Sequence, residues 1–128
     1  MTVSLSKISN IILRVGELGR SLAFYRDRLG MTVLGAAGEF AFLDGGGLTL
    51  ALNAVGEEIE ANPPGLVEVV FEVDDVEATY VALTGAGVQF RVAPRTVMSS
   101  DGRDLLAADF RDPDGNVLSI TGWRSAVS

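Results

Sequence analysis

Apolar residues occupy every second position in two runs of the chain, 58 positions apart: Ile11, Leu13 and Val15, then Val69, Phe71 and Val73. A period of two is typical of a half-buried β-strand, because successive side chains of a strand point to opposite faces of the sheet. Each run leads into a helical pattern, so the repeated unit is a strand followed by a helix. We therefore predict strands over residues 10–15 and 68–73 and a duplicated chain.

The first half continues with a helix and three short strands. Four apolar residues spaced by 4, 3 and 4 positions form one helical stripe: Leu18, Leu22, Tyr25 and Leu29. Gly30 is a stop signal, because glycine tolerates the left-handed backbone at a helix end. Strands are predicted over 31–34, 39–43 and 48–52, with a turn over 35–38 and a hairpin signal over 44–47. The first half is therefore βαβββ.

The second half predicts the same order of elements. Asp74, with Glu77 three residues later, resembles a capping box at the start of a helix that ends near residues 85–87. Further strands are predicted over 88–92, 105–111 and 117–121, with a turn over 112–116 that its Asp, Pro, Gly and Asn residues favour. Residues 93–104 are predicted to form a long polar loop, a kind of loop that often covers a site.

The ends of the two halves also match, now at an offset of 68 positions: residues 42–44 with 110–112, and 48–52 with 116–120. The change of offset places ten extra residues chiefly after Val92. We predict a single α+β domain over residues 1–128, in which two tandem βαβββ modules form a cupped mixed sheet with the helices on its outer face. Module 1 covers about residues 6–53, a linker rich in breakers covers 54–65, and module 2 covers about 66–121.

The composition excludes several kinds of chemistry. The 128 residues include no cysteine and no histidine, which excludes disulfides, thiolate metal sites and catalysis by a histidine base. The formal net charge of −7 repels nucleic acid and anionic membranes. No apolar run approaches the roughly 20 residues that span a bilayer, and the N-terminus lacks the apolar core of a secretory signal. We therefore expect a cytoplasmic protein that binds neither nucleic acid nor membranes.

Three motifs resemble those of the glyoxalase/bleomycin-resistance/dioxygenase proteins, also called the vicinal oxygen chelate superfamily. They are LAFYRDRLGM at residues 22–31, FEVDDV at 71–76 and FRDPDGNVLSI at 110–120. The resemblance implies that the two modules enclose a ligand and that the protein is a homodimer, with or without exchange of modules between chains. It also implies which strand positions hold a divalent metal in the family's enzymes; here they are Asn10, Ala51, Glu68 and Ser119.

Only one of these four residues is a carboxylate. A catalytic zinc needs about three ligands of the His, Cys or carboxylate type, and magnesium or manganese favours more than one carboxylate. We therefore predict that the chain has no metal site and no cofactor, and that the family's metal-dependent activities do not carry over to it.

The alternation along the strands predicts which side chains face the ligand. They are Asn10, Ile12, Arg14, Thr49, Ala51, Glu68, Val70, Glu72, Ser119, Thr121 and Trp123. This mixed apolar and polar lining, with few aromatic residues, suits a small organic ligand. Arg14 and Glu72 either contact that ligand or pair with each other. Trp123 either contacts it or packs near the C-terminus.

Three functions remain open from the sequence. The first is a binding protein that sequesters a cationic or aromatic compound such as an antibiotic, as the resistance branch of the superfamily does without using a metal. The alternative is a metal-independent lyase or isomerase in which Glu68 is the general base and Arg14 anchors an oxyanion or a carboxylate. Glu68 either binds a cation or acts as that base, or it is a solvated or hydrogen-bonded glutamate left from a lost site. The third is a metalloenzyme with an unusual ligand set.

Overall fold

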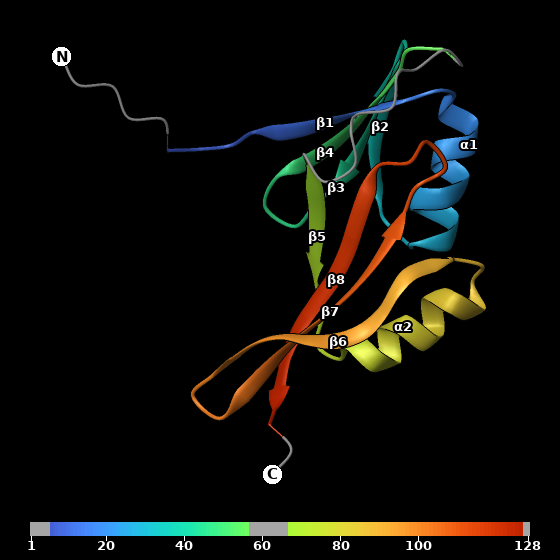
Figure 1. Cartoon of the computed structure of the whole chain (residues 1–128). Helices are drawn as coiled ribbons and strands as arrows, with labels where there is room; N and C mark the ends of the chain where they lie inside the picture. Colours follow the sequence, from blue (N-terminus) through green and yellow to red (C-terminus); the bar gives the residue numbers. More distant parts are fainter. Residues whose placement is uncertain (1–5, 57–66, 127–128) are drawn as a thin grey trace, which may run out of the picture. The chain divides into compact units, whose positions relative to one another are not determined.

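The computed structural model describes residues 6–56 and 67–126 (Figure 1). The chain divides into two compact units, Met1–Ile59 and Glu60–Ser128. Each unit contains a strand, a helical segment and three further strands in that order, so the predicted α+β fold of two tandem βαβββ modules is confirmed. Most of the predicted linker, 54–65, lies outside the described residues.

The first unit is a four-stranded mixed sheet with one helical segment. Its elements are β1 (Asn10–Val15), α1 (Leu18–Leu22), η1 (Ala23–Arg28), β2 (Val33–Ala37), β3 (Phe40–Asp44) and β4 (Thr49–Ala54). The strand order is β1-β4-β3-β2, with β1 parallel to β4 and the other neighbours antiparallel. The strand predicted over 31–34 ends too early, because β2 extends to Ala37. The glycine and the two alanines at 35–37 have low strand propensity, but pairing with β3 keeps them in the sheet.

The helix predicted over residues 18–29 forms in two parts. Glu17 caps α1, because its carboxylate accepts hydrogen bonds of 2.9 and 3.2 Å from backbone N–H groups of the first turn. η1 is a π-helical turn, in which the Leu29 N–H donates to the carbonyl of Phe24 over 3.0 Å. Both Phe24 and Tyr25 are buried. Of these two residues, the predicted apolar stripe included only Tyr25.

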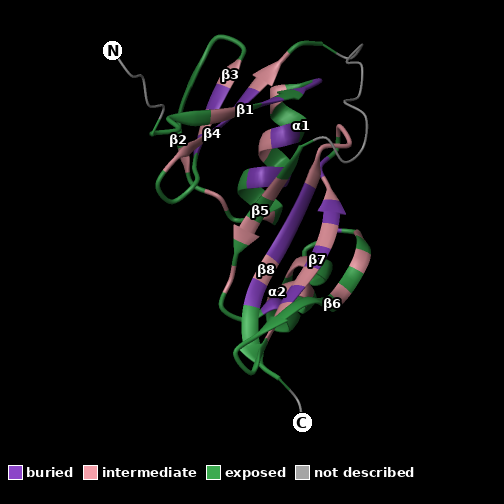
Figure 2. Cartoon of the chain, turned by 60° about the vertical axis from the view of Figure 1, so that its left-hand side comes forward, coloured by how far each residue is buried: buried purple, intermediate pink, exposed green. Residues whose placement is uncertain are grey.

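The sheet of the first unit buries one of its faces (Figure 2). The strands contribute these core residues: Leu13, Val15, Ala41, Leu43, Leu50 and Leu52. Burying a valine or leucine side chain fully contributes roughly 1.5–3 kcal/mol, so this face holds the unit together. Phe40 and Phe42 lie on the opposite face with their rings stacked, centroids 6.1 Å apart.

The second unit repeats this arrangement with β5 (Glu68–Glu72), α2 (Val76–Gly85), β6 (Phe90–Ser100), β7 (Arg103–Arg111) and β8 (Val117–Ser125). The strand order is β5-β8-β7-β6, and β5 is parallel to β8. The ring of Phe90 lies 4.7 Å from that of Tyr80 on α2 and 5.0 Å from that of Phe110 on β7, which ties the helix to the sheet. Among the described residues of both units, no helix is long and apolar enough to cross a membrane.

Residues 93–104 do not form the predicted loop. They belong to the β6–β7 hairpin, whose two turn residues, Asp101 and Gly102, have φ angles of 53° and 72°, as in a tight hairpin turn. The hairpin is 22 residues long and its counterpart β2–β3 is 12 residues long, so the ten extra residues lengthen both strands. The prediction failed because most of this ribbon is exposed, and an exposed ribbon needs no apolar alternation.

The helix α2 has Asp75 as its cap, not Asp74 as predicted. The Asp75 carboxylate accepts a hydrogen bond of 2.9 Å from the backbone N–H of Ala78. Two adjacent aspartates favour a cap equally well, so only the observed start of the helix at Val76 distinguishes them. Asp74 therefore takes no part in this cap.

The predicted turn over residues 112–116 is confirmed. Asp112 is only 5% exposed, and its carboxylate accepts hydrogen bonds from the backbone N–H groups of Asp114 (2.9 Å) and Asn116 (2.8 Å). It also accepts one from Asn116 Nδ2 over 2.8 Å. One buried carboxylate therefore organises the connection from β7 to β8.

We predict that Asp112→Ala lowers the free energy of unfolding by about 2–3 kcal/mol, because it removes charge-assisted hydrogen bonds and leaves their donors without a partner. Urea denaturation of the purified protein measures this loss. The control is Glu39→Ala, which removes an exposed carboxylate from the β2–β3 turn and should change stability by less than about 0.5 kcal/mol. Equal losses in the two variants would contradict the role given to Asp112.

Candidate functional site

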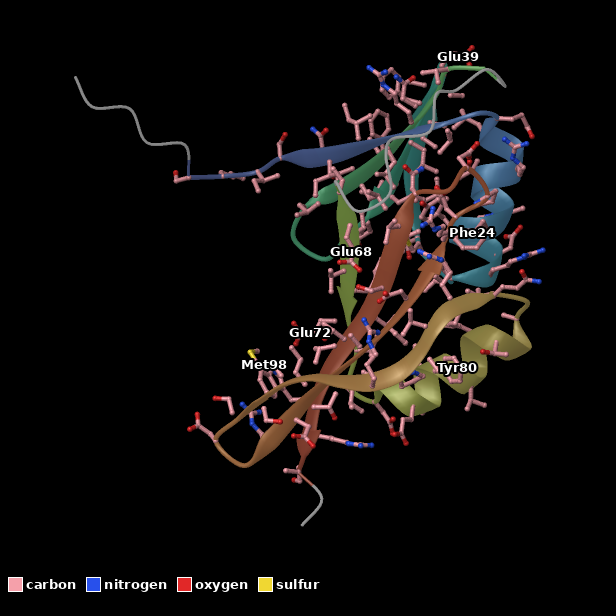
Figure 3. All side chains as sticks on the ribbon, viewed as in Figure 1. Phe24, Glu39, Glu68, Glu72, Tyr80 and Met98 are labelled. Carbon is pink, nitrogen blue, oxygen red and sulfur yellow. The ribbon has the colours of Figure 1, made fainter. Side chains whose placement is uncertain are left out.

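A hollow of about 390 Å³ opens in the second unit at the end of β5. It is lined by Glu72, Val73, Asp74, Leu105, Thr121, Gly122 and Trp123. All of these residues come from β5 and the segment that follows it, from β7 and from β8. Figure 3 shows Glu72 and Glu68 at opposite ends of β5, and only Glu72 lines the hollow.

The hollow forms where β5 leaves the sheet. Glu72 pairs with Thr121 of β8, and the Val73 N–H donates to the Thr121 carbonyl over 2.9 Å. Beyond this point β8 continues to Ser125, paired with β7. The segment that follows β5 turns away from β8 into α2. The β7–β8 pair therefore forms the floor of the hollow, and the β5–α2 connection forms its wall.

Gly122 allows this wall to lie close to the floor. A Cβ atom built at Gly122 would collide with the carbonyl oxygen of Val73 and would lie 3.3 Å from Cγ2 of Val76. The obstacle on the first side is backbone, which cannot rotate away as a flexible side chain can. Glycine is therefore required here for close approach of two backbone segments.

Two carboxylates and one indole ring give the hollow its chemistry. Glu72 and Asp74 are exposed, and within the described part of the second unit neither forms an ion pair. The Thr121 hydroxyl donates to a carbonyl of β7 over 2.8 Å, so it is held in the sheet. Trp123 is 36% exposed, and the guanidinium carbon of Arg103 lies 4.9 Å from its ring centroid. Negative charge beside a flat apolar ring suits a cation.

The arginines that pair with carboxylates in this unit do so outside the lining of the hollow. They are Arg95, 3.6 Å from Asp109, and Arg124, 2.6 Å from Glu77. Exposed pairs of this kind contribute about 0–1 kcal/mol each. Neither of these two arginines pairs with Glu72 or Asp74.

Three of the predicted ligand residues line the hollow: Glu72, Thr121 and Trp123. Trp123 is thus a half-exposed lining residue and not a packed core residue. Leu105 was not predicted, since its pairing with Trp123 depends on the register of the unexpected hairpin. Asp74 was assigned to the helix cap instead. The role of Gly122 has no sequence signal, because the backbone that it meets is 49 residues away.

Glu68, Val70 and Ser119 share the face of Glu72 but lie outside the hollow. Val70 pairs with Ser119, while Glu68 pairs with Val117. Glu68 is exposed and lies four residues from Glu72, about 13 Å along the strand. Ser119 is 3% exposed, so its hydroxyl is out of reach of a ligand on the surface.

The predicted ligand residues of the first unit share one face of its sheet. They are Asn10, Ile12 and Arg14 of β1 and Thr49 and Ala51 of β4. Two aromatic residues that were not predicted as ligand residues share this face: Phe42 pairs with Ala51, and Phe40 precedes it by two residues. The period of two over residues 40–43 is the signal that identifies them. Arg14 and Glu72 belong to different units, so their pairing stays a prediction.

The four family positions do not fit a metal ion. Asn10 offers an amide, Ala51 a methyl group, Glu68 an exposed carboxylate and Ser119 a buried hydroxyl. In the parts of the chain that the structure describes, no cluster of three or more His, Cys, Asp or Glu side chains could hold a metal ion. One strong oxygen donor falls short of the sets that hold zinc or magnesium in proteins.

Comparison with known proteins shows the family. Residues 7–120 match the Glyoxalase/Bleomycin resistance protein/Dioxygenase superfamily, and the chain belongs to this superfamily. YraH, an uncharacterized protein of Bacillus subtilis (strain 168), is 32% identical over 126 residues, covering 89% of this chain and 96% of YraH. The metallothiol transferase FosB of Lysinibacillus sphaericus (strain C3-41) is 30% identical over 118 residues, covering 89% of this chain and 80% of FosB.

Solved structures show the same fold. The crystal structure of a glyoxalase/bleomycin resistance protein/dioxygenase from Nocardioides has a TM-score of 0.73 and 24% sequence identity to this chain. The match covers 99% of this chain and 91% of the other. At this identity the likeness supports the fold alone.

We predict that Gly122→Ala costs about 1–3 kcal/mol of stability, because the added methyl group must displace the Val73 carbonyl. The hollow should open or distort at the same time. The control is Gly35→Ala on β2, where an added Cβ has no atom within 4 Å. Urea denaturation and the fluorescence of Trp123, the single tryptophan, measure the two effects. Equal behaviour of the two variants would show that the approach at Gly122 is not tight.

We predict that a chelator does not change the thermal stability of the protein. The reason is that the four family positions supply only one carboxylate to hold a metal ion. Elemental analysis of protein purified without chelator should find no stoichiometric divalent metal. EDTA should shift the midpoint of thermal unfolding by less than about 1 °C, since losing a ligand of the native state would lower it. One equivalent of metal, or a clear drop in the midpoint, would show that other donors hold an ion.

Proposed function

We propose that the protein binds a small cationic aromatic compound in the hollow of its second unit, without catalysing a reaction. The observation that carries this proposal is that Glu72, Asp74 and Trp123 line one hollow. Sequestration of a toxic compound, such as an antibiotic, is the biological role that such binding supports. The homodimer that the family resemblance implies is part of the same proposal.

The size and charge of the hollow support this ligand class. Its volume of about 390 Å³ lies at the lower end of the range for small-molecule sites, roughly 300–1,000 Å³. A cation over a tryptophan ring gains about 0.5–2 kcal/mol, depending on how far it is desolvated. Two carboxylates within the same lining add attraction for the positive charge and oppose an anionic ligand.

The donors at the four family positions support binding more than transfer chemistry. The superfamily name includes bleomycin resistance proteins, whereas the likeness to FosB favours metal-dependent thiol transfer as a second candidate. The latter would need a metal site, and the four family positions lack the donors for one. Binding requires only the charges and the ring that line the hollow.

The alternative with Glu68 as the general base of a lyase or isomerase has less support. Glu68 is exposed and lies outside the hollow, whereas a general base must reach the proton of a bound substrate. The alternative stays open to a direct test: a turnover that disappears in Glu68→Gln, with the fold intact, would favour it over simple binding.

We predict that benzyltrimethylammonium quenches the fluorescence of Trp123 saturably, with a dissociation constant on the order of 1 mM for so small a ligand. Glu72→Gln and Asp74→Asn should each weaken binding about fivefold, because each removes a charge next to the cation. The effect should diminish as salt increases. Benzyl alcohol, which has the ring without the charge, should bind more weakly.

The control for this experiment is Glu39→Gln. It removes the same charge from the exposed β2–β3 turn of the first unit, labelled in Figure 3. Its affinity for benzyltrimethylammonium should equal that of the wild type. Quenching that does not saturate, or an equal loss in Glu39→Gln, Glu72→Gln and Asp74→Asn, would contradict a specific cation site in the hollow.

A further inference from the structure

The ring that we propose for the ligand already holds a cation from the chain itself. The guanidinium carbon of Arg103 lies 4.9 Å from the centroid of the Trp123 ring, within the distance at which a cation is attracted to an aromatic face. Arg103 is the first residue of β7, immediately after the turn of the long hairpin. It is exposed, so it can leave the ring at a small cost.

The register of the hairpin places this arginine on the same face of the sheet as two residues that line the hollow, Leu105 and Trp123. Leu105 pairs with Trp123 and Arg103 pairs with Ser125, so Arg103 reaches Trp123 diagonally across the two strands. Residues two apart on a strand share a face, which puts Arg103 on the same face as Leu105, a lining residue. The Ala126 N–H donates to the carbonyl of Gly102 over 3.0 Å and holds the turn against the end of β8.

We propose that Arg103 is a specificity-determining residue that competes with the ligand for the face of Trp123. This inference rests on the proposed function, since it concerns the same hollow. A cationic ligand must displace the guanidinium from the ring or bind beside it, and both routes weaken its binding. A neutral aromatic compound meets no repulsion from Arg103. The arginine thus lowers the affinity for simple cations and favours ligands whose aromatic body supplies additional contact.

The negative charge of the hollow gives a reason for a positively charged residue beside it. Glu72 and Asp74 alone would attract any small cation, including the abundant inorganic ones and free amines. The positive charge of Arg103 opposes such cations, which gain nothing from the indole ring that could offset the repulsion. A ligand that displaces it must offer the ring a better partner than a guanidinium, which is itself a good stacking group.

The experiment compares two arginine variants of equal charge change. Arg103→Gln should bind benzyltrimethylammonium about three- to tenfold more tightly than the wild type, because both the competition and the repulsion are lost. Arg124→Gln is the matched control: Arg124 lies on β8 next to Trp123 but pairs with Glu77. Its affinity should change less than about twofold. Arg103→Lys keeps the charge but stacks less well on the ring, so its affinity should lie between those of the wild type and Arg103→Gln.

Benzyl alcohol separates the repulsion by the charge of Arg103 from a simple opening of the hollow. Its affinity should rise less in Arg103→Gln than that of benzyltrimethylammonium, because it loses a competitor for the ring but no repulsion. If the wild type binds benzyltrimethylammonium and the affinities of Arg103→Gln and Arg124→Gln are equal, the role of Arg103 is overturned. The proposed function stands in that case. An equal gain for benzyl alcohol in Arg103→Gln also overturns it. Absence of saturable quenching in the wild type and in all three variants is a different result, and it overturns the proposed function itself.

Discussion

The parallel pairing of β5 with β8 is the constraint on which the candidate site depends. It places Glu72 beside Thr121 and ends where the Val73 N–H meets the Thr121 carbonyl. Because β5 then turns into α2 while β8 continues along β7, a hollow must form at the point of departure. Gly122 lets the departing backbone stay close to β8, so the wall and the floor of the hollow face each other at short range. A different register would place other side chains at this position.

The same pairing exists in the first unit, and the comparison shows what is new in the second. β1 and β4 pair in parallel as β5 and β8 do, but Arg14 stands where the second unit has Glu72, and Val55 stands where it has Trp123. The β2–β3 hairpin is ten residues shorter than β6–β7, so it has no counterpart of Arg103 or Leu105. Several residues that line the hollow are therefore ones in which the two halves differ.

Much of the fold could be predicted because it depends on local signals. The period of two identified β1 and β5, and the Asp, Pro and Gly residues identified the turn at 112–116. Glu72, Thr121 and Trp123 were predicted to share a face for the same reason. The long hairpin could not be predicted, since a ribbon exposed on both faces carries no apolar alternation. The roles of Leu105 and Gly122 could not be predicted either, because they depend on strand register and on tertiary contact.

The distribution of donors along β5 favours the proposed binding of an organic cation over metal chemistry. Glu68 carries a carboxylate, while the other three positions that the family resemblance assigns to a metal carry an amide, a methyl group and a buried hydroxyl. Four residues further on, Glu72 lies where the strand leaves the sheet, together with a second carboxylate and an indole. A metal ion requires several donors at once, and these four positions supply only one strong donor. An organic cation requires only charge and a ring, so the end of the strand can gain a ligand by a few substitutions and a longer hairpin.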